Sequence, residues 1–487
     1  MSGNLLSAKD LVRQSHRPDI FLKFKYAECF LKLGYVPDSI KEMYLQSIEA
    51  FNSFNEFLPR KIGPQDFLKH FDDLIESIKT RGFVPNQDDE VISVNNEMEI
   101  IGGAHRVSIL AALNMYIPKI QVQNNQNVFD FEYFEKRKMN EEALRYSLLV
   151  KAYLGADLSC LIVHSKVSTE IYKQIEHLIE NRTRIIHSVN MKLELDQTLF
   201  IKFINYRDSN EHESWIGTLK SKYAPIYDHA RKSYGKFPVR IILIPKLSDS
   251  SIRDLKEEIR ALPEVGNFGI HSTESAEETR QILELFCHPT TSLMFREKYI
   301  NCDIEFIAEA QDISSQLSHE NLVNKDRFVV GGSYTLEVFR LRRARDLDVF
   351  TDVTPLREDS IKSKSGRIIE CHDLSEEHPL DSIDDILLDP KNHLYLFNIP
   401  IISLMKLKKW KLTRNEKPKD LQDIELIDAL LSSSGDYHRN QSRYTNHIKW
   451  KLRAFFTRAR IATFRFLYSY SVTRIIGKKI LSILRGL

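Results

Sequence analysis

The sequence predicts a multidomain protein of mixed α/β (α+β) class, and three observations support this prediction. The chain has 487 residues, which is enough for about three domains. Its residues are 42% hydrophobic and 28% charged, an ordinary balance for a globular protein. Strand-like apolar runs also alternate with amphipathic helical segments, and glycines follow two of the strands. We expect four parts, at residues 1–125, 126–320, 321–436 and 437–487.

The first 125 residues predict aromatic-rich helices followed by a small α/β module. Gly82 ends an amphipathic helix, and Asn95-Asn96 is a turn pair between two short strand-like runs. Gly102 and Gly103 separate the second strand from another helix. The expected elements of this module are a helix at 67–80, strands at 90–94 and 99–101, a helix at 104–113 and a strand at 119–122.

The junction Gly102-Gly103-Ala104-His105-Arg106 is a candidate phosphate-binding site. Glycines at a strand-to-helix junction let an anion approach the backbone N–H groups. The guanidinium of Arg106 matches the geometry of a phosphate, and His105 can exchange a proton near neutral pH. The alternative is a glycine-rich helix start with an arginine on the surface.

Over about residues 60–125 the chain resembles the ParB/sulfiredoxin-like fold, and the Gly-Gly-x-His-Arg form is nearest to sulfiredoxin. Sulfiredoxins carry their reactive cysteine where this chain has Ala104, so sulfinic-acid repair is not expected. The resemblance implies nucleotide phosphate binding at Gly102, Gly103, His105 and Arg106. Some members of the fold are small-molecule kinases, including free-serine kinases, and others bind DNA and hydrolyse CTP. Candidates for the acid of such a kinase are Asp66, Asp88, Asp89 and Glu90.

The region 126–320 predicts helices followed by a small α/β unit of unknown role. Residues 130–235 are expected to be largely helical, and the α/β unit is expected to begin at Pro238 with the apolar strand VRIILIP. A capping-box pattern starts a helix at Ser275. His271, at the end of an expected strand, suits a hydrogen-bonded structural role better than ligand binding.

A strand-like apolar run at 328–330 is followed by the turn Gly331-Gly332-Ser333, and Asp346 and Asp348 begin the next strand. Side chains two apart on a strand share a face, so the two carboxylates are expected to project together. Neighbouring carboxylates repel unless a cation lies between them, and Mg²⁺ binds through carboxylates and substrate phosphates. The turn adds backbone N–H groups that suit a phosphate.

This stretch resembles the DNA polymerase β-like nucleotidyltransferase superfamily over about residues 321–431. The resemblance implies that Asp346 and Asp348 hold Mg²⁺ (or Mn²⁺) against a nucleoside triphosphate bound at the glycine turn. It also implies a third catalytic carboxylate on a later strand, for which Glu370 is the nearest candidate and Asp373 the runner-up. Glu370 and His372 share one face of that strand and Asp373 lies on the other, so the choice depends on the register.

Basic residues near this motif are candidates for binding the triphosphate. Arg345, among the three arginines that precede the aspartates, and Lys406 are the positions we favour, with Lys409 as an alternative to Lys406. A solvated helix face accounts for these lysines equally well. Three further residues are expected to organise the start and packing of the next helix, namely Lys419, Asp420 and Asp423.

The charge of the chain is unevenly distributed. The net charge is +2, but residues 437–487 hold 12 Lys or Arg and no acidic residue, which leaves 57 basic and 67 acidic residues, or −10, in the remainder. Apolar residues at near-helical spacing within 444–487 predict a basic amphipathic helix, which suits an anionic membrane surface. A tail that binds nucleic acid would need the same positive charge, but it would not need so many apolar residues. Packing on the protein itself is the third alternative.

The expected location is the cytoplasm, with the tail at the inner face of the cell membrane. The N-terminus has no apolar run of the length of a signal peptide, and no stretch approaches the roughly 20 apolar residues of a transmembrane helix. The five cysteines form no CxxC pair, which fits a reducing compartment and argues against a zinc site.

Three functions are compatible with these features. The first is a bifunctional enzyme that phosphorylates or binds an alcohol through its N-terminal module and transfers a nucleotidyl group to a phosphorylated sugar, polyol or similar acceptor. Its layout is similar to proteins of bacterial surface-polysaccharide precursor synthesis. The second is a toxin-like or defence nucleotidyltransferase that modifies tRNA or protein. The third is a ParB-like DNA-associated binding protein, against which the acidic body argues.

Overall fold

The computed structural model describes residues 6–57, 60–83, 91–118, 120–123, 128–205, 224–319, 327–352, 361–363, 366–378, 381–414 and 418–433. These ranges contain twenty helices and several separate sheets, so the chain belongs to the mixed α/β class as expected. Contacts divide the chain into two compact units, residues 1–51 with 71–427 and residues 52–70 with 428–487. In the described ranges, every helix is too short or too polar to traverse a lipid bilayer. The expected basic tail at 437–487 lies outside the described residues.

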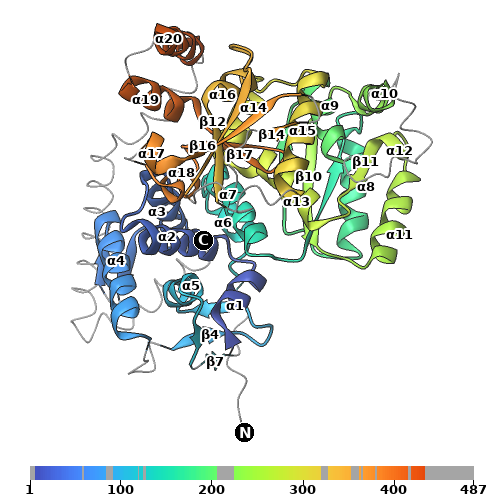
Figure 1. Cartoon of the computed structure of the whole chain (residues 1–487). Helices are drawn as coiled ribbons and strands as arrows, with labels where there is room; N and C mark the ends of the chain where they lie inside the picture. The colour runs from blue at the N-terminus through green and yellow to red at the C-terminus, as the bar shows by residue number, and fades with distance from the viewer. Residues whose placement is uncertain are drawn as a thin grey trace, which may run out of the picture. The chain divides into compact units, whose positions relative to one another are not determined.

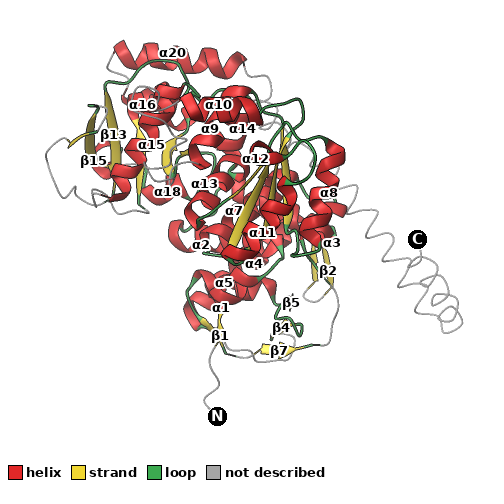
Figure 2. Cartoon of the chain, turned by 90° about the vertical axis from the view of Figure 1, so that its right-hand side faces the viewer, coloured by secondary structure: helices red, strands yellow, loops and turns green. Residues whose placement is uncertain are grey.

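The N-terminal part of the larger unit contains helices around a small three-stranded sheet. The sheet has the order β5-β4-β7, with β4 antiparallel to β5 and parallel to β7. Helix α5 packs against α1 and α2, and Figure 2 shows α5 and α1 beside this sheet. The elements are β1 (Leu6–Ser7), α1 (Ala8–Gln14), α2 (Pro18–Leu33), α3 (Asp38–Asn52), α4 (Pro64–Arg81), β4 (Ile92–Val94), β5 (Ile100–Gly102), α5 (Ala104–Ala112), β6 (Tyr116–Ile117) and β7 (Ile120–Val122), and residues 64–70 of α4 belong to the smaller unit.

A buried ion cluster fastens the start of α2 to strand β5. The Arg17 guanidinium donates to the carbonyl oxygen of Ile100 at 2.8 Å and to the Asp19 carboxylate at 2.9 Å. The Lys23 ammonium donates to the same carboxylate at 2.5 Å, and Asp19 is fully buried. Burial alone would raise the pKa of Asp19, but the two cations hold it well below its usual range.

The smaller unit contributes an antiparallel hairpin, β2 (Asn55–Phe57) with β3 (Arg60–Ile62). Its turn into α4 is closed by Asp66, whose carboxylate accepts from the backbone N–H of Ile62 at 2.9 Å. Asp66, a candidate kinase acid, therefore has a local capping role, and the other candidates at 88–90 lie outside the described residues.

The middle part of the larger unit is built on a four-stranded antiparallel sheet of order β11-β8-β10-β9. With α8 after β8 and α11 after β10, this order is that of a β-α-β-β-α-β unit with α9 and α10 inserted. The elements are α6 (Phe131–Lys136), α7 (Glu141–Tyr153), β8 (Leu158–Val163), α8 (Thr169–Glu180), β9 (His187–Met191), α9 (Leu195–Asn205), α10 (Ala224–Ser233), β10 (Val239–Pro245), α11 (Asp249–Arg260), α12 (Gly266–Gly269), β11 (Ile270–Ser272), α13 (Ala276–Cys287), α14 (Pro289–Arg296) and α15 (Ile304–His319).

The expectation that residues 130–235 are largely helical was wrong at β8 and β9. Every residue of β8 is buried, and such a continuous apolar run cannot be distinguished from a buried helix by its periodicity. The α/β unit therefore begins at β8, about 80 residues before Pro238. Figure 1 shows α8 and α11 on one side of the sheet and α13 on the other. Apolar residues of α8 and α11, such as Ile175 and Leu255, form one core with Leu161 and Ile242 of the sheet.

The C-terminal part of the larger unit contains a six-stranded mixed sheet of order β14-β15-β13-β12-β17-β16. Strand β13 is antiparallel to β12 and parallel to β15, and β12 is parallel to β17. The elements are β12 (Phe328–Gly331), α16 (Gly332–Val338), β13 (Asp346–Thr351), β14 (Ile361–Lys362), β15 (Ile368–Asp373), α17 (Leu374–Glu377), α18 (Ile383–Leu387), β16 (His393–Leu396), β17 (Ile399–Ile402), α19 (Leu404–Arg414) and α20 (Pro418–Ser433). The predicted strand, glycine turn and second strand are confirmed here, and α16 begins at the turn.

Candidate functional site

The register of the central strands brings Glu370 next to Asp348. Asp348 of β13 is opposite Gly331 of β12 on one side and opposite Glu370 of β15 on the other. Residues opposite each other on neighbouring strands project from the same face, so the two carboxylates share a face. Asp373 lies on the other face, where its side chain accepts from the backbone N–H of Ser375 at 2.8 Å and caps α17. The register thus favours Glu370 over Asp373, and the catalytic role of Glu370 stays a prediction.

The glycine turn makes room for the Asp348 carboxylate. Gly332 has a φ of +63°, and a Cβ atom added there would lie 1.8 Å from Oδ2 of Asp348. A Cβ atom on Gly331 would lie 2.8 Å from the ring of Phe350. Any side chain at Gly332 would occupy the place of the carboxylate, so this close approach needs glycine.

The nearby donor atoms suit a divalent metal ion. Among the described residues, one oxygen each of Asp348 and Glu370 and one ring nitrogen of His372 lie within 4.8 Å of one another. Nε2 of His372 lies 3.3 Å from Oδ1 of Asp348 and 3.9 Å from Oε2 of Glu370. The hydrogen bond to Asp348 raises the pKa of His372, although burial opposes this. Asp346, predicted as a metal ligand with Asp348, does not belong to this group.

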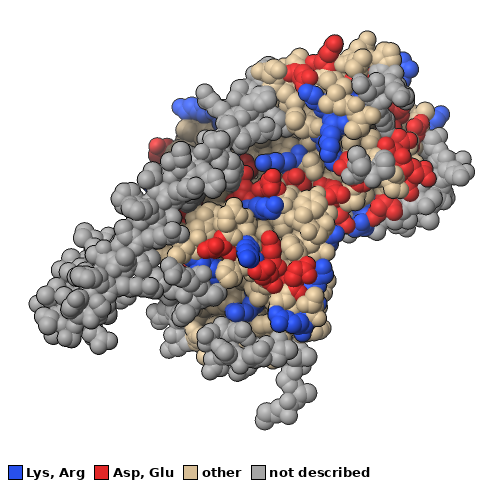
Figure 3. Space-filling view, turned by 90° about the vertical axis from the view of Figure 1, so that its left-hand side faces the viewer, with Lys and Arg blue, Asp and Glu red and all other residues tan. Residues whose placement is uncertain are grey.

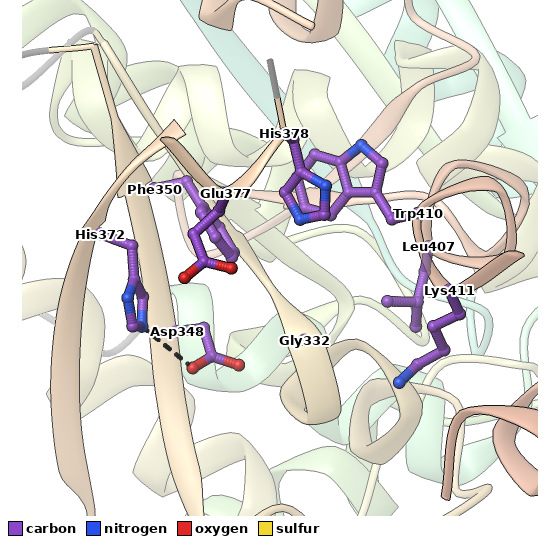
Figure 4. A pocket seen from close by; sticks show the side chains of 9 residues that line it. All are labelled: Gly332, Asp348, Phe350, His372, Glu377, His378, Leu407, Trp410 and Lys411. Atoms are coloured by element: carbon purple, nitrogen blue, oxygen red, sulfur yellow. Dashed lines mark hydrogen bonds and ion pairs between the residues drawn. The ribbon is translucent and has the colours of Figure 1, made fainter. Parts of the chain in front are cut away.

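A cavity of about 190 Å³ opens beside these residues, and Figure 4 shows its walls. One wall is aromatic, because the rings of His378 and Trp410 stack with centroids 3.7 Å apart and Phe350 meets Trp410 at 5.2 Å. The opposite wall carries Asp348 and His372. The cavity is lined by Gly332, Asp348, Phe350, His372, Glu377, His378, Leu407, Trp410 and Lys411.

A network of charged side chains connects α20 and α19 to the glycine turn. The Lys411 ammonium contacts carboxylate oxygens of Asp420 at 2.7 Å and Asp423 at 2.8 Å. Asp423 also accepts from Nε of Arg342 at 2.8 Å, and Arg342 donates to the hydroxyl of Ser333 at 2.9 Å. Burial would raise the pKa of Asp423, but Arg342 and Lys411 lower it. This network accords with the structural role expected for Asp420 and Asp423.

The structure does not bring Lys406 or Arg345, the predicted triphosphate ligands, to the wall of the cavity. The ammonium of Lys406 is buried against Asp381 at 2.5 Å, and Arg345 is exposed. Leu407, Trp410 and Lys411 of α19 line the cavity, whereas the ammonium of Lys406 is held by Asp381 and does not reach it. Lys411 and His372 were therefore missed. The alternation along β15 placed His372 on the face of Glu370, but it did not show which face carries Asp348.

At the N-terminal candidate site, the predicted strand, glycine turn and helix are confirmed. Gly103 has a φ of +75° and is the N-cap of α5, and a Cβ atom there would lie 3.2 Å from Cα of Ile92. Nε2 of His105 lies 3.0 Å from the hydroxyl of Tyr44, and its ring meets that of Phe71 edge-on. Gly102 ends β5, and Arg106 lies in the first turn of α5. Phosphate binding by this junction stays a prediction.

Two histidines of the middle part are held by buried partners. His271 lies 2.7 Å from a carboxylate oxygen of Glu278, in line with the structural role expected for it. Nε2 of His164 lies 2.8 Å from the ammonium of Lys202 inside the core. Burial lowers the pKa of Lys202 to about 7 and, together with Lys202, holds that of His164 well below its usual value.

Comparison of the chain with protein-family models, with curated proteins and with solved structures finds no match.

Proposed function

We propose that the chain is a nucleotidyltransferase that uses Mg²⁺ or Mn²⁺ to move a nucleotidyl group from a nucleoside triphosphate to a small phosphorylated acceptor. The observation that carries the proposal is the pairing of Asp348 with Gly331 and Glu370, beside Gly332 and next to a cavity. Two carboxylates that share a face with a glycine turn provide metal ligands and room for phosphate in one place. The acceptors we expect are sugar phosphates, polyol phosphates and similar compounds.

Each part of the site has a role in this reaction. A divalent cation held by Asp348 and Glu370 would neutralise charge on the α-phosphoryl group and on the leaving pyrophosphate. Asp348 and Glu370 would supply its oxygen ligands, and Gly332 leaves the space that the Asp348 carboxylate occupies. The contacts of Arg342 with Ser333 and Asp423 keep that turn in position. An acceptor phosphate, with a second pKa of about 6, is already ionised near neutral pH and needs no base.

The proposal is tested by pyrophosphate release from the full chain with each nucleoside triphosphate, Mg²⁺ or Mn²⁺, and a panel of sugar and polyol phosphates. At least one pair of substrates should support turnover. Asp348→Asn should lower the turnover about 100-fold or more, because a metal ligand is lost. Glu376→Gln, an exposed carboxylate on the neighbouring helix α17, is the matched control and should not change it. If no pair reacts, or if Asp348→Asn reacts like the control, the proposal is rejected.

An assay with labelled nucleotide distinguishes transfer to a small phosphorylated acceptor from modification of tRNA or protein, the main alternative. Transfer of label to tRNA or to a protein, with none to small phosphates, would favour the toxin-like or defence class. Acidic and basic side chains are intermixed on the face of the molecule shown in Figure 3. Such a surface suits small substrates better than a long nucleic acid, which prefers a continuous basic face.

We further propose that the N-terminal module binds nucleotide phosphate at Gly102, Gly103, His105 and Arg106, and that it phosphorylates the acceptor. The N-terminus of α5 supports this role, because its N-cap residue Gly103 makes no side-chain capping hydrogen bond and the first N–H groups of a helix suit an anion. Arg106→Ala should weaken nucleotide binding to this module without changing pyrophosphate release from an acceptor that is already phosphorylated. If this variant lost pyrophosphate release, the proposal that the N-terminal and C-terminal sites act separately would be contradicted.

The layout of the chain supports a place in bacterial surface-polysaccharide precursor synthesis, at the inner face of the cell membrane. The support comes from the sequence of residues 444–487, whose basic and apolar residues suit anionic lipid. A vesicle-binding experiment for this proposal is given in the Discussion.

A further inference from the structure

The ligand atoms beside Asp348 form a mixed oxygen and nitrogen set. Nε2 of His372 lies 3.3 Å from Oδ1 of Asp348 and 3.9 Å from Oε2 of Glu370. Ligands that bind one ion at about 2.0–2.2 Å lie about 3 Å apart when adjacent and about 4 Å apart when opposite. Nε2 of His372 is therefore spaced from each carboxylate oxygen like a ligand of the same ion, and one ligand atom from each of the three residues lies within 4.8 Å of the others.

The surroundings hold the imidazole in this position. His372 is opposite Phe350 in the register of β13 and β15, and the two rings lie 5.4 Å apart at an angle of 31°. Asp348 and His372 both line the cavity, so an ion between them can be reached from the side on which a substrate would bind. Figure 4 shows the imidazole turned toward Asp348. The Asp348 carboxylate fits beside Gly332, because glycine lacks the Cβ atom that would displace it.

The identity of the donor atoms affects which ion is preferred. Mg²⁺ favours an octahedron of oxygen ligands, whereas an imidazole nitrogen favours first-row transition metals. We propose that His372 is a nitrogen ligand of this site, and that the site therefore prefers Mn²⁺ or another divalent transition-metal ion to Mg²⁺. The inference rests on the proposed function for the location of the site, but it concerns binding of the ion rather than turnover.

Binding of Mn²⁺ to the full chain, without nucleotide, tests the inference by electron paramagnetic resonance. The concentration of free Mn²⁺ is measured in a titration, first alone and then with Mg²⁺ as competitor. Pulsed spectra show whether a ¹⁴N nucleus is directly bound to the Mn²⁺ ion. We expect bound Mn²⁺ with a ¹⁴N signal, and displacement only by Mg²⁺ in about tenfold or greater excess. His372→Gln should remove the ¹⁴N signal and weaken Mn²⁺ binding about 10- to 100-fold. His177→Gln, on the exposed face of α8, is the matched control and should behave like the wild type.

A second variant keeps the inference testable if His372→Gln does not fold. His372→Glu restores a ligand but makes the set all-oxygen, so it should bind ions and lose its preference for Mn²⁺ over Mg²⁺. Bound Mn²⁺ without a ¹⁴N signal in the wild-type chain would overturn the inference. An unchanged ratio of Mn²⁺ to Mg²⁺ affinity in both variants would overturn it as well, and would show that His372 is only an ion-pair partner of Asp348.

The experiments distinguish failure of the proposed nucleotidyltransferase function from failure of the proposed nitrogen ligand. If Mn²⁺ binds with a ¹⁴N signal that depends on His372, but no substrate pair releases pyrophosphate, the proposed function is wrong and the metal site stands. If pyrophosphate is released equally well with Mg²⁺ and His372→Gln changes neither binding nor spectrum, the nitrogen ligand is wrong and the proposed function stands.

Discussion

Replacing Gly332 by alanine would place a methyl group where the Asp348 carboxylate now lies. We expect a cost in backbone strain and a steric clash with Asp348, and the same substitution at a second glycine distinguishes the two effects. Gly332 has a φ of +63°, and alanine in this left-handed region costs about 1–2 kcal/mol of folding free energy. Gly155 has a φ of +77° and no atom within 4 Å of an added Cβ, so Gly155→Ala should show the backbone cost alone.

The steric effect is specific to Gly332. The added Cβ atom would lie 1.8 Å from Oδ2 of Asp348, whereas ordinary contact begins at 3.4 Å, so the two atoms must separate by about 1.6 Å. Misplacing a reacting or ligating group by about 1 Å can cost about 100-fold in rate, which corresponds to about 2.7 kcal/mol in the activation free energy. We expect a loss of at least this size in pyrophosphate release, and weaker Mn²⁺ binding.

Urea unfolding, Mn²⁺ titration and pyrophosphate release would be measured for both variants. Gly332→Ala should lose at least as much unfolding free energy as Gly155→Ala, and only Gly332→Ala should lose metal binding and turnover. If Gly332→Ala binds Mn²⁺ as tightly as Gly155→Ala, then the position of the Asp348 carboxylate does not determine metal binding, and the assignment of the site is refuted.

Four other predictions concern different parts of the chain. Asp19→Asn leaves two buried cations without their carboxylate and should lower the unfolding free energy by about 3–5 kcal/mol in urea titrations, and a loss below about 1 kcal/mol would contradict a buried ion cluster. Lys202 has a folded pKa of about 7 and an ordinary value of 10.5, so the unfolded chain binds more protons between these values, and wild-type stability should rise with pH across this window. Lys202→Met should remove this rise, which is at most about 1.4 kcal/mol per pH unit, and an unchanged pH profile of stability would show that Lys202 does not titrate there. Deleting residues 444–487 should abolish sedimentation with vesicles that contain anionic lipid, and the membrane proposal is wrong if the full chain never sediments with them. Asp346 lies two residues before Asp348 on β13 and shares its face, so Asp346→Ala tests the sequence prediction that it is a metal ligand; pyrophosphate release should fall about 100-fold or more with an unchanged circular dichroism spectrum, and normal release would contradict that prediction.

Much of the C-terminal site could be predicted from local sequence. An apolar run, two glycines and an alternating strand are properties of neighbouring residues, and they correctly predicted β12, the turn and β13. The same holds for β5, Gly103 and α5 near the N-terminus. Strand β8 was missed, because a fully buried strand lacks the alternation by which a half-buried one is recognised. Strand β9 does alternate in burial, but one of its inward residues is His187, so its apolar alternation is weak.

The sequence by itself determined which residues could share a face, and only the tertiary structure decided which faces meet. Strand alternation placed Glu370 and His372 on one face of β15 and Asp373 on the other. The pairing of β13 with β15 then decided that the face with Glu370 and His372 is the one that carries Asp348. The packing of α19 likewise turned Lys411 rather than Lys406 toward the cavity. The periods of strands and helices are local, whereas strand register and helix packing depend on long-range burial of apolar surface, which no short stretch of sequence contains.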